Sequence, residues 1–225
     1  MAVTFDAASS NGSDTVGQTS ISTTHTASGT NRYVIVGLSF RRETSDVSGI
    51  SVSYDGVPMS QIGSIVGPGT NVSACAMFGL ANPNTTAGAT VSASWTNGQS
   101  WTEIGVVSFT GVLGGIGTPV TQVSANSSSP SVTVSSATGD MVIDTLATSG
   151  GTTATVGVGQ TQRWNRSSAT SFIGSGSTEP GGASVVMTWS LLFADQVNYM
   201  AVNLLGTAPA TSGKNFPTLT LLGVG

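Results

Sequence analysis

Short stretches of alternating apolar and polar residues cover most of this chain, and glycine or proline interrupts them frequently. Breaks spaced about 8–12 residues apart are typical of short β-strands joined by turns. We find no long stretch with the apolar spacing of a helix. The clearest predicted strands are residues 31–42, 49–62, 71–81, 89–95, 100–112, 139–148, 183–192 and 196–206.

Three short breaks predict β-hairpins. Asp55-Gly56 lies between two apolar runs, and this dipeptide supplies the positive φ angles that a tight turn needs. Asn97-Gly98 separates strands 89–95 and 100–112, and residues 193–195 separate the last two strands. Segments rich in Ser, Thr, Gly or Pro are predicted to be loops, namely 7–15, 114–131, 149–153 and 174–183.

A dozen or so short strands without helices predict an all-β chain, with two packed antiparallel sheets in a jelly-roll-like sandwich. We expect one domain over residues 1–206, with 114–131 as the best candidate for a boundary. We see no fixed-period repeat of the solenoid or propeller kind. The predicted core contains Val34, Val36, Phe40, Val52, Phe78, Trp95, Ile104, Val106, Val142, Leu146, Val186 and Met200.

The last segment, residues 207–225, differs from the rest of the chain. A stretch rich in Pro, Gly and Ser is followed by an apolar run from Phe216 to Leu222. We expect this run to dock, either on the chain's own sheet or as an added strand on a neighbouring subunit. Phe216, Leu219 and Leu221 are its candidate contact residues.

Charge is scarce in this protein. Only 7% of residues are charged, against about 25% in a typical soluble domain. The net charge of −4, without a cluster of basic residues, argues against nucleic-acid binding. A nearly neutral surface favours association with other copies or work outside the cytoplasm.

Targeting and redox signals are also sparse. The first residues lack the basic and apolar regions of a signal peptide, and no apolar run reaches the ~18 residues of a membrane span. We therefore expect no membrane partner. The single cysteine, Cys75, excludes an intrachain disulfide and is expected to be a small buried residue.

Candidates for catalysis are few. His25 is the only histidine, and its alternating surroundings predict a surface strand rather than a catalytic triad. A zinc site would need several Cys or His ligands, which the chain lacks. A glycosidase would need two carboxylates at one cleft, for which Glu103 and Asp144 are the acids within good strands. An ion pair of Glu103 with an arginine across the sheet, and a buried Asp144 that accepts bonds from loop amides, are the simpler interpretations.

Two kinds of ligand stay open. The aspartates near turns, such as Asp6 and Asp140, could contribute to a calcium site, although no Asp-x-Asp spacing supports one. Exposed aromatic faces and amides could hold a sugar, although each tryptophan lies in strand-like sequence where core packing is commoner. The candidate sugar-binding residues are Trp101, Trp164, Trp189, Tyr199, Gln160 and Gln162.

The segment GQTQRWNR, residues 159–166, places two arginines beside a tryptophan. Simple alternation gives it no apolar face, so it predicts an exposed strand rather than a core strand. Arginine and tryptophan are enriched at the energetic centres of protein interfaces. Arg163, Trp164 and Arg166 are therefore predicted to contact a subunit or another partner.

Five segments together resemble a group of β-sandwich proteins encoded in tailed-phage genomes and found in some bacterial secreted proteins. They are VTFDAASS, HTASGTNRYVIVGLSF, VSYDGVPM, GDMVIDTLAT and GQTQRWN, and the resemblance covers most of residues 1–206. It implies a virion structural role, such as a capsid decoration or cement protein, a head fibre or a tail-associated protein. Its motifs are turns and strands, so the resemblance implies no catalytic residues.

The sequence therefore favours a non-enzymatic bacteriophage virion structural protein, most simply a capsid decoration protein. It would form homo-oligomers and bind capsid or other virion proteins without a cofactor. The alternative is a carbohydrate-binding or adhesion module of an extracellular or tail-associated protein, with a surface glycan as partner. A glycan-cleaving enzyme that uses Glu103 and Asp144 is the third hypothesis.

Overall fold

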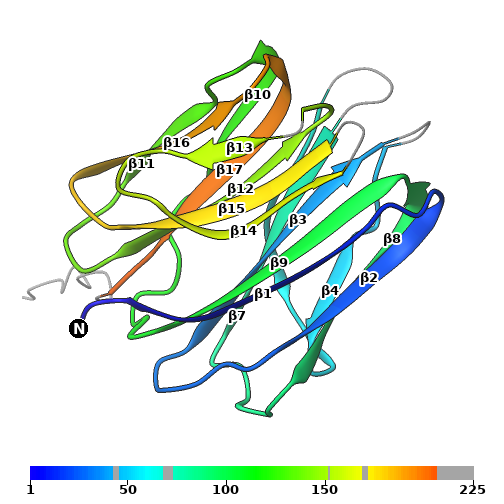
Figure 1. Ribbon diagram of the computed structural model, residues 1–225. Helices are drawn as coiled ribbons and strands as arrows, with labels where there is room; N and C mark the ends of the chain where they lie inside the picture. The colour runs from blue at the N-terminus through cyan, green and yellow to red at the C-terminus, as the bar shows by residue number, and fades with distance from the viewer. Residues whose placement is uncertain (43–45, 68–72, 152, 169–171, 207–225) are drawn as a thin grey trace, which may run out of the picture.

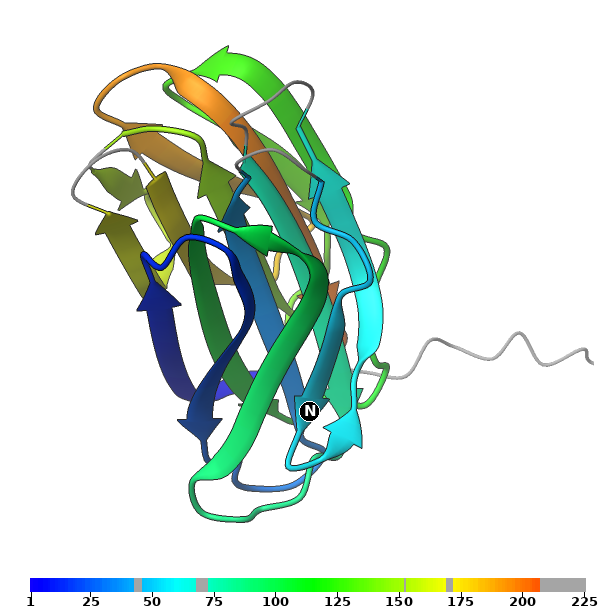
Figure 2. The same cartoon turned by 90° about the vertical axis from the view of Figure 1, so that its right-hand side faces the viewer.

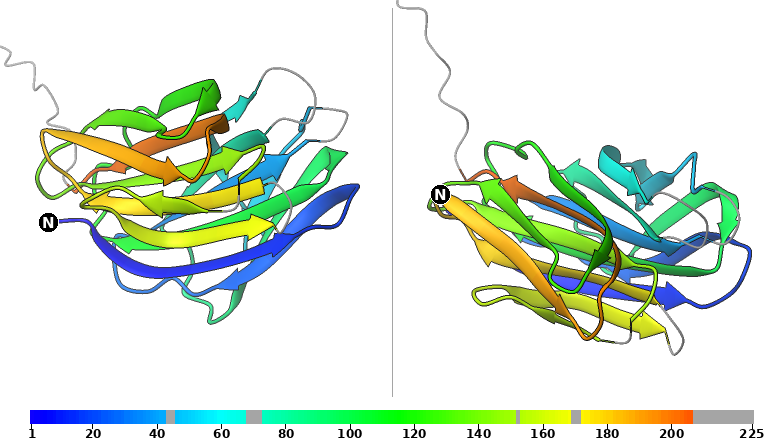
Figure 3. Two further views of the ribbon diagram at one scale, coloured as in Figure 1. Left: turned by 45° about the horizontal axis from the view of Figure 1, so that its top comes forward. Right: turned by 90° about the horizontal axis from the view of Figure 1, so that it is seen from above.

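Antiparallel strands make up the regular structure of this chain. A computed structural model describes residues 1–42, 46–67, 73–151, 153–168 and 172–206, and these ranges contain no helix. The all-β antiparallel sandwich predicted from the sequence is confirmed. The prediction of two sheets is wrong, because the strands form four sheets that stack as four layers (Figures 1 and 3).

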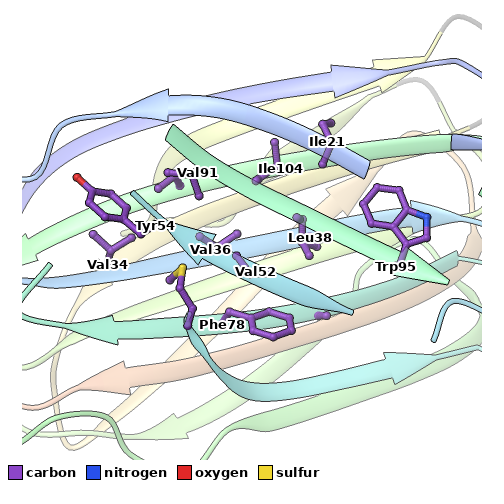
Figure 4. Packing of buried hydrophobic residues seen from close by; sticks show 14 of the residues in the cluster. Ile21, Val34, Val36, Leu38, Val52, Tyr54, Phe78, Val91, Trp95 and Ile104 are labelled. Atoms are coloured by element: carbon purple, nitrogen blue, oxygen red, sulfur yellow. The ribbon is translucent and has the colours of Figure 1, made fainter. Parts of the chain in front are cut away.

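The first two layers are built from the first half of the chain. Layer 1 has the spatial order β2 (Gln18–His25), β8 (Ala89–Gln99), β4 (Ser51–Tyr54), β5 (Val57–Pro58). Layer 2 has the order β1 (Thr4–Ser13), β9 (Trp101–Thr110), β3 (Tyr33–Arg41), β7 (Ser73–Ala81), β6 (Ser60–Val66). Alternate side chains such as Val36, Val91 and Ile104 fill the core between these layers (Figure 4).

The other two layers are built from the second half. Layer 3 has the order β10 (Val120–Ser127), β17 (Asp195–Leu204), β12 (Met141–Thr148), β15 (Phe172–Pro180), β14 (Thr161–Ser168). Layer 4 has the order β11 (Ser131–Ser135), β16 (Ser184–Leu191), β13 (Ala154–Val156). Val142, Met187 and Trp189 belong to the core between layers 3 and 4.

A third core lies between layers 2 and 3, which pack face to face. Ile35 and Met77 of layer 2 meet Ile143 and Met200 of layer 3 there. The residue that follows Ile35, Val36, points into the core between layers 1 and 2. Strand β3 therefore has both faces buried. A strand buried on both faces needs a continuous apolar run, which explains the segment YVIV at residues 33–36.

The two halves have the same strand order. Layer 2 places the first strand of its half beside the last, and layer 3 repeats this arrangement with β10 beside β17. Layers 1 and 4 likewise place the second strand of each half beside the next-to-last strand of that half, in the pairs β2–β8 and β11–β16. Each half thus has the sheet arrangement of a jelly roll, and the chain is a duplicated one.

The duplication is also visible in the residues once the strands are aligned. ATVSASW at 89–95 corresponds to ASVVMTW at 183–189, and both tryptophans, Trp95 and Trp189, are buried. Strands β6 and β14 carry bulges at equivalent places, after Gln61 and after Gln162. Each repeat spans about half of the described chain, which is too long and too divergent for the short repeats of solenoids and propellers.

Two of the three predicted hairpins are wrong. Asp55 and Gly56 have φ angles of 49° and 77° and join the paired strands β4 and β5, as predicted. Around Asn97-Gly98, however, β8 pairs within layer 1 and β9 pairs within layer 2. Likewise β16 and β17 lie in layers 4 and 3. Consecutive strands in these places cross between sheets, which local sequence does not reveal.

Three predicted loops contain strands. Segments 7–15, 114–131 and 174–183 overlap β1, β10 and β15, respectively. Strand β15 is buried despite its glycines and serines, because large side chains from other strands occupy the space above them. Val186 is the one wrong member of the predicted core: its exposed fraction is 49%, since it lies on the outer face of layer 4.

Candidate functional site

The arginine- and tryptophan-rich segment forms β14, the edge strand of layer 3. Regular alternation would place Arg163 and Trp164 on opposite faces of that strand. A β-bulge between Gln162 and Trp164 breaks the alternation. Both side chains consequently contact layer 2, where the Arg163 guanidinium lies 3.6 Å from the ring centroid of Phe5.

Trp164 is buried inside the chain rather than exposed to a partner. Its side chain lies in the core between layers 2 and 3, with an exposed fraction of 3%. The indole ring fills a slot made by Gly37, Gly105 and Gly176, where added Cβ atoms would overlap it or press against it. The prediction that Trp164 is a partner contact is therefore wrong. Glycines from three other strands create the slot, and two of these strands are far from Trp164 in the chain, so local sequence does not predict it.

The two arginines also have partners within the chain. Arg163 Nε donates to Thr178 Oγ1 at 2.8 Å. Arg166 Nη2 lies 2.9 Å from Asp14 Oδ1, and its Nε lies 3.9 Å from Glu103 Oε2. Both arginines are only partly buried, so a partner contact through their exposed atoms stays a prediction. Phe216, Leu219 and Leu221 lie outside the described residues.

Glu103 and Asp144 do not face one cleft. The Glu103 side chain lies between layers 2 and 3, where Gly12, Gly174 and Arg166 surround it. The expected ion pair with an arginine exists at a long distance, and the arginine comes from the facing sheet rather than from the same one. Asp144 instead points into the core between layers 3 and 4. This separation removes the geometric basis for the glycosidase hypothesis.

Asp144 is fully buried, as its apolar surroundings predicted, but strand residues supply most of its partners, and one loop amide, Gln160 Nε2 just before β14, donates to it at 3.3 Å. Its carboxylate accepts hydrogen bonds from Tyr199 Oη at 2.6 Å, Trp189 Nε1 at 3.0 Å, and the backbone N and Oγ of Ser177 at 2.6 and 2.8 Å. Burial raises the pKa of Asp144 to about 6, against the lowering effect of these donors. The carboxylate thus cross-links three strands of the second half.

Glu103 makes stability depend on pH. Burial raises the pKa of Glu103 from 4.5 to about 8, against attraction by Arg166. The folded state therefore keeps a proton that the unfolded chain releases, and the free energy of unfolding falls as pH rises from about 4.5 to about 8. Between pH 6.5 and 8, which lies above the Asp144 pKa of about 6, we expect the free energy of unfolding to fall by an amount on the order of 2 kcal/mol.

Glu103→Gln is expected to remove this fall, because glutamine does not titrate. Urea denaturation at several pH values measures it, with the exposed Asp55→Asn as control. If the free energy of unfolding changed with pH equally in the wild type and in Glu103→Gln over that range, this result would contradict the assignment of the pH dependence to Glu103.

His25 is buried, so its prediction as a surface residue is wrong. Its Nδ1 lies 3.0 Å from Ser9 Oγ, and its Nε2 lies 2.9 Å from Ser108 Oγ. Ser108 Oγ in turn donates to Asp6 Oδ2 at 2.7 Å. Burial lowers the pKa of His25, although Asp6 raises it in part. These bonds join β1, β2 and β9 at one edge of the first jelly roll.

Most of the aromatic candidates for sugar binding are core residues. Trp164, Trp189 and Tyr199 are all at least 97% buried. Trp101 is partly buried, and the Arg41 guanidinium covers its ring at 4.5 Å from the centroid. Aromatic stacking by the predicted residues is therefore not the way in which this protein would hold a sugar.

A groove that the sequence analysis missed lies over layer 1, on the side of the molecule that faces the viewer in Figure 2. Its volume is about 600 Å³, within the range of about 300–1,000 Å³ that is usual for ligand sites. All of its lining residues are uncharged: Asn11, Gly12, Ser13, Gln18, Ser20, Ile21, Ser22, Ser51, Ser53, Ser92, Ala93 and Ser94.

The sequence carries a signal for this groove. Ser-x-Ser occurs in three strands, as 20–22, 51–53 and 92–94. The strands pair so that these six serines form two rows across β2, β8 and β4. Serine is common throughout the chain, however, and only the pairing of the strands reveals that these residues are neighbours.

Comparisons with known proteins add no assignment. The chain has no significant match to protein-family models, to curated protein sequences or to solved structures. Within the described ranges, His, Cys, Asp and Glu side chains do not gather in groups of three that could hold a metal ion. The same residues include no helix that is long and apolar enough to cross a membrane.

Proposed function

We propose that this chain is a non-enzymatic structural protein of a bacteriophage virion, most simply a capsid decoration protein. The observation that carries the proposal is the duplicated sandwich, in which two jelly rolls share a buried core between layers 2 and 3. This arrangement makes a four-layer block whose two outer sheets face in opposite directions. Capsid proteins are among the proteins that use jelly rolls, so the fold supports this role by analogy.

The surface supports the same proposal. Layer 4 exposes small hydroxyl residues such as Ser131, Thr133 and Ser184, and layer 1 exposes the paired serines. With 7% charged residues in the whole chain, close packing of many copies brings little charge repulsion. Two outer faces on related jelly rolls would allow one chain to contact two neighbours in a shell.

Molar mass in solution tests the assembly part of the proposal. We compare the full chain of 22.4 kDa with a version ending at Gly206, which keeps every described residue, by light scattering. The full chain is expected to form a closed homo-oligomer, and the shorter version is expected to be a monomer with an unchanged melting temperature. Monomers at both lengths would contradict assembly through residues 207–225.

Retention on particles tests the location. We expect the protein to remain on purified particles of the phage that encodes it through a density gradient. Its absence from washed particles would contradict a virion role.

A further inference from the structure

The groove over layer 1 is formed by an irregularity of the fold and not by a flat sheet. Between Gln18 and Ser20 of β2, the partner strand β8 advances from Gln99 to Ser94. Two residue intervals on β2 thus face five on β8, which makes a large β-bulge in β8. The end of β1 forms another part of the wall, where Asn11 Nδ2 donates to the backbone oxygen of Ser22 at 2.7 Å.

Hydroxyl groups in the groove form a regular grid. Ser94 lies opposite Ser20 on one side and Ser51 on the other. Ser92 lies opposite Ser22 and Ser53 in the next row. Neighbouring strands are about 4.8 Å apart and alternate residues about 6.8 Å apart, so the grid offers closely spaced groups that can both donate and accept hydrogen bonds.

The second jelly roll provides an internal comparison. Val186 of layer 4 occupies the position of Ser92, and its paired neighbour is Thr133. Strand β13 pairs with β16 only as far as Trp189, so within the described residues no third strand lies beside Val186. The same position therefore folds with an exposed valine in the second jelly roll, whereas in the first the Ser92 hydroxyl lies 2.9 Å from the Ser53 hydroxyl.

Amide groups lie at the end of the groove. Gln18 lines it, and Gln99 lies directly opposite Gln18 in the strand pair. Opposed residues of an antiparallel pair share a face. Gln99 is fully buried, its Nε2 donates to the Asn97 backbone oxygen, and its Oε1 has no hydrogen-bond partner among the described residues. Gln99 is not among the lining residues, so Gln18 and Asn11 are the amide side chains that line the groove.

From these features we infer that the groove over layer 1 binds a neutral oligosaccharide, recognised by hydrogen bonds to the serine grid and the flanking amides. Sugar hydroxyls donate and accept as serine hydroxyls do, whereas an anionic ligand would find no charged side chain in the lining. A peptide would need apolar pockets, yet the apolar lining side chains Ile21 and Ala93 are buried. The groove lies on the outer face of layer 1, which is one of the two faces proposed above to contact neighbours, whereas the assembly contact tested above involves residues 207–225.

Saturation-transfer NMR with the full chain tests this inference. The probes are neutral hexasaccharides of glucose, mannose, galactose and N-acetylglucosamine, with hexagalacturonate as the anionic comparison. At least one neutral probe is expected to bind, and Ser92→Val is expected to weaken that binding about tenfold by removing a central hydroxyl. Ser184→Val, at an exposed position of the equivalent strand in layer 4, is the matched control and is expected to bind as the wild type does.

Three results would overturn the inference. Binding of none of the four neutral probes excludes the site, and preferential binding of hexagalacturonate excludes the proposed chemistry. Equal weakening by Ser92→Val and Ser184→Val would place the ligand elsewhere. Both variants introduce a residue that strands favour, and circular dichroism is used to check that they fold. The oligomeric state is measured separately, so failure here is distinguishable from failure of the virion proposal.

Discussion

Replacing Trp164 with alanine is expected to lower the free energy of unfolding by about 3–5 kcal/mol. The indole ring occupies the slot between layers 2 and 3, and alanine would leave a cavity in the core that joins the two jelly rolls. Its Nε1 has no hydrogen-bond partner among the described residues, so the loss is one of packing. Urea denaturation followed by circular dichroism measures the change.

Trp101→Ala is the matched control for this prediction. Trp101 packs against the same core but is only partly buried, so its replacement is expected to cost about 1–2 kcal/mol. A loss at Trp164 no larger than the loss at Trp101 would contradict the position of the indole ring.

A double-mutant cycle with Gly105 tests the slot directly. A Cβ atom at Gly105 would overlap the Trp164 ring, so Gly105→Ala alone is expected to destabilise the protein by about 1–3 kcal/mol. In a Trp164→Ala background this penalty is expected to disappear, because the methyl group then enters the cavity. Additive effects of the two substitutions would show that the residues are not in contact.

Asp144→Val is expected to destabilise the protein by about 3–5 kcal/mol, because it leaves buried donors without an acceptor. Tyr199, Trp189 and Ser177 all donate to the Asp144 carboxylate. The equivalent residue of the first jelly roll is Val36, which lies in an apolar core. Valine therefore fits the backbone at this position, and the expected loss comes from the unsatisfied donors.

Thermal and urea denaturation at neutral pH measure this loss, and Asp144→Asn separates shape from charge. Asparagine keeps one oxygen acceptor, so its cost is expected to be smaller than that of valine. The control is Asp55→Asn in the exposed β4–β5 turn, where the change is expected to stay within about 0.5 kcal/mol. A stable Asp144→Val variant would contradict the hydrogen-bonded cluster.

The sequence predicted features that depend on residues close together in the chain. The Asp55-Gly56 turn and most strands were correct, because turn residues and alternation act over a few positions. Cys75 is buried, as its residue type predicted. Strand β15 was missed, since its glycines have meaning only beside the side chains that pack over them.

The candidate sites were harder to predict for the same reason. Trp164 was assigned to the surface because a bulge, invisible in the sequence, turned it into the core. The groove was missed because its serines come from three strands that pair only in the fold. A comparison of ATVSASW with ASVVMTW would have indicated the duplication, and with it two sandwiches instead of one.

By itself, the sequence determined the all-β class, the nearly neutral surface and the turn at residues 55 and 56. These follow from composition and from interactions between residues that are neighbours in the chain. Only the tertiary structure decided the four layers, the glycine slot for Trp164 and the hydroxyl groove over layer 1. Each of these joins strands tens of residues apart, and packing between sheets depends on shapes that no local pattern contains.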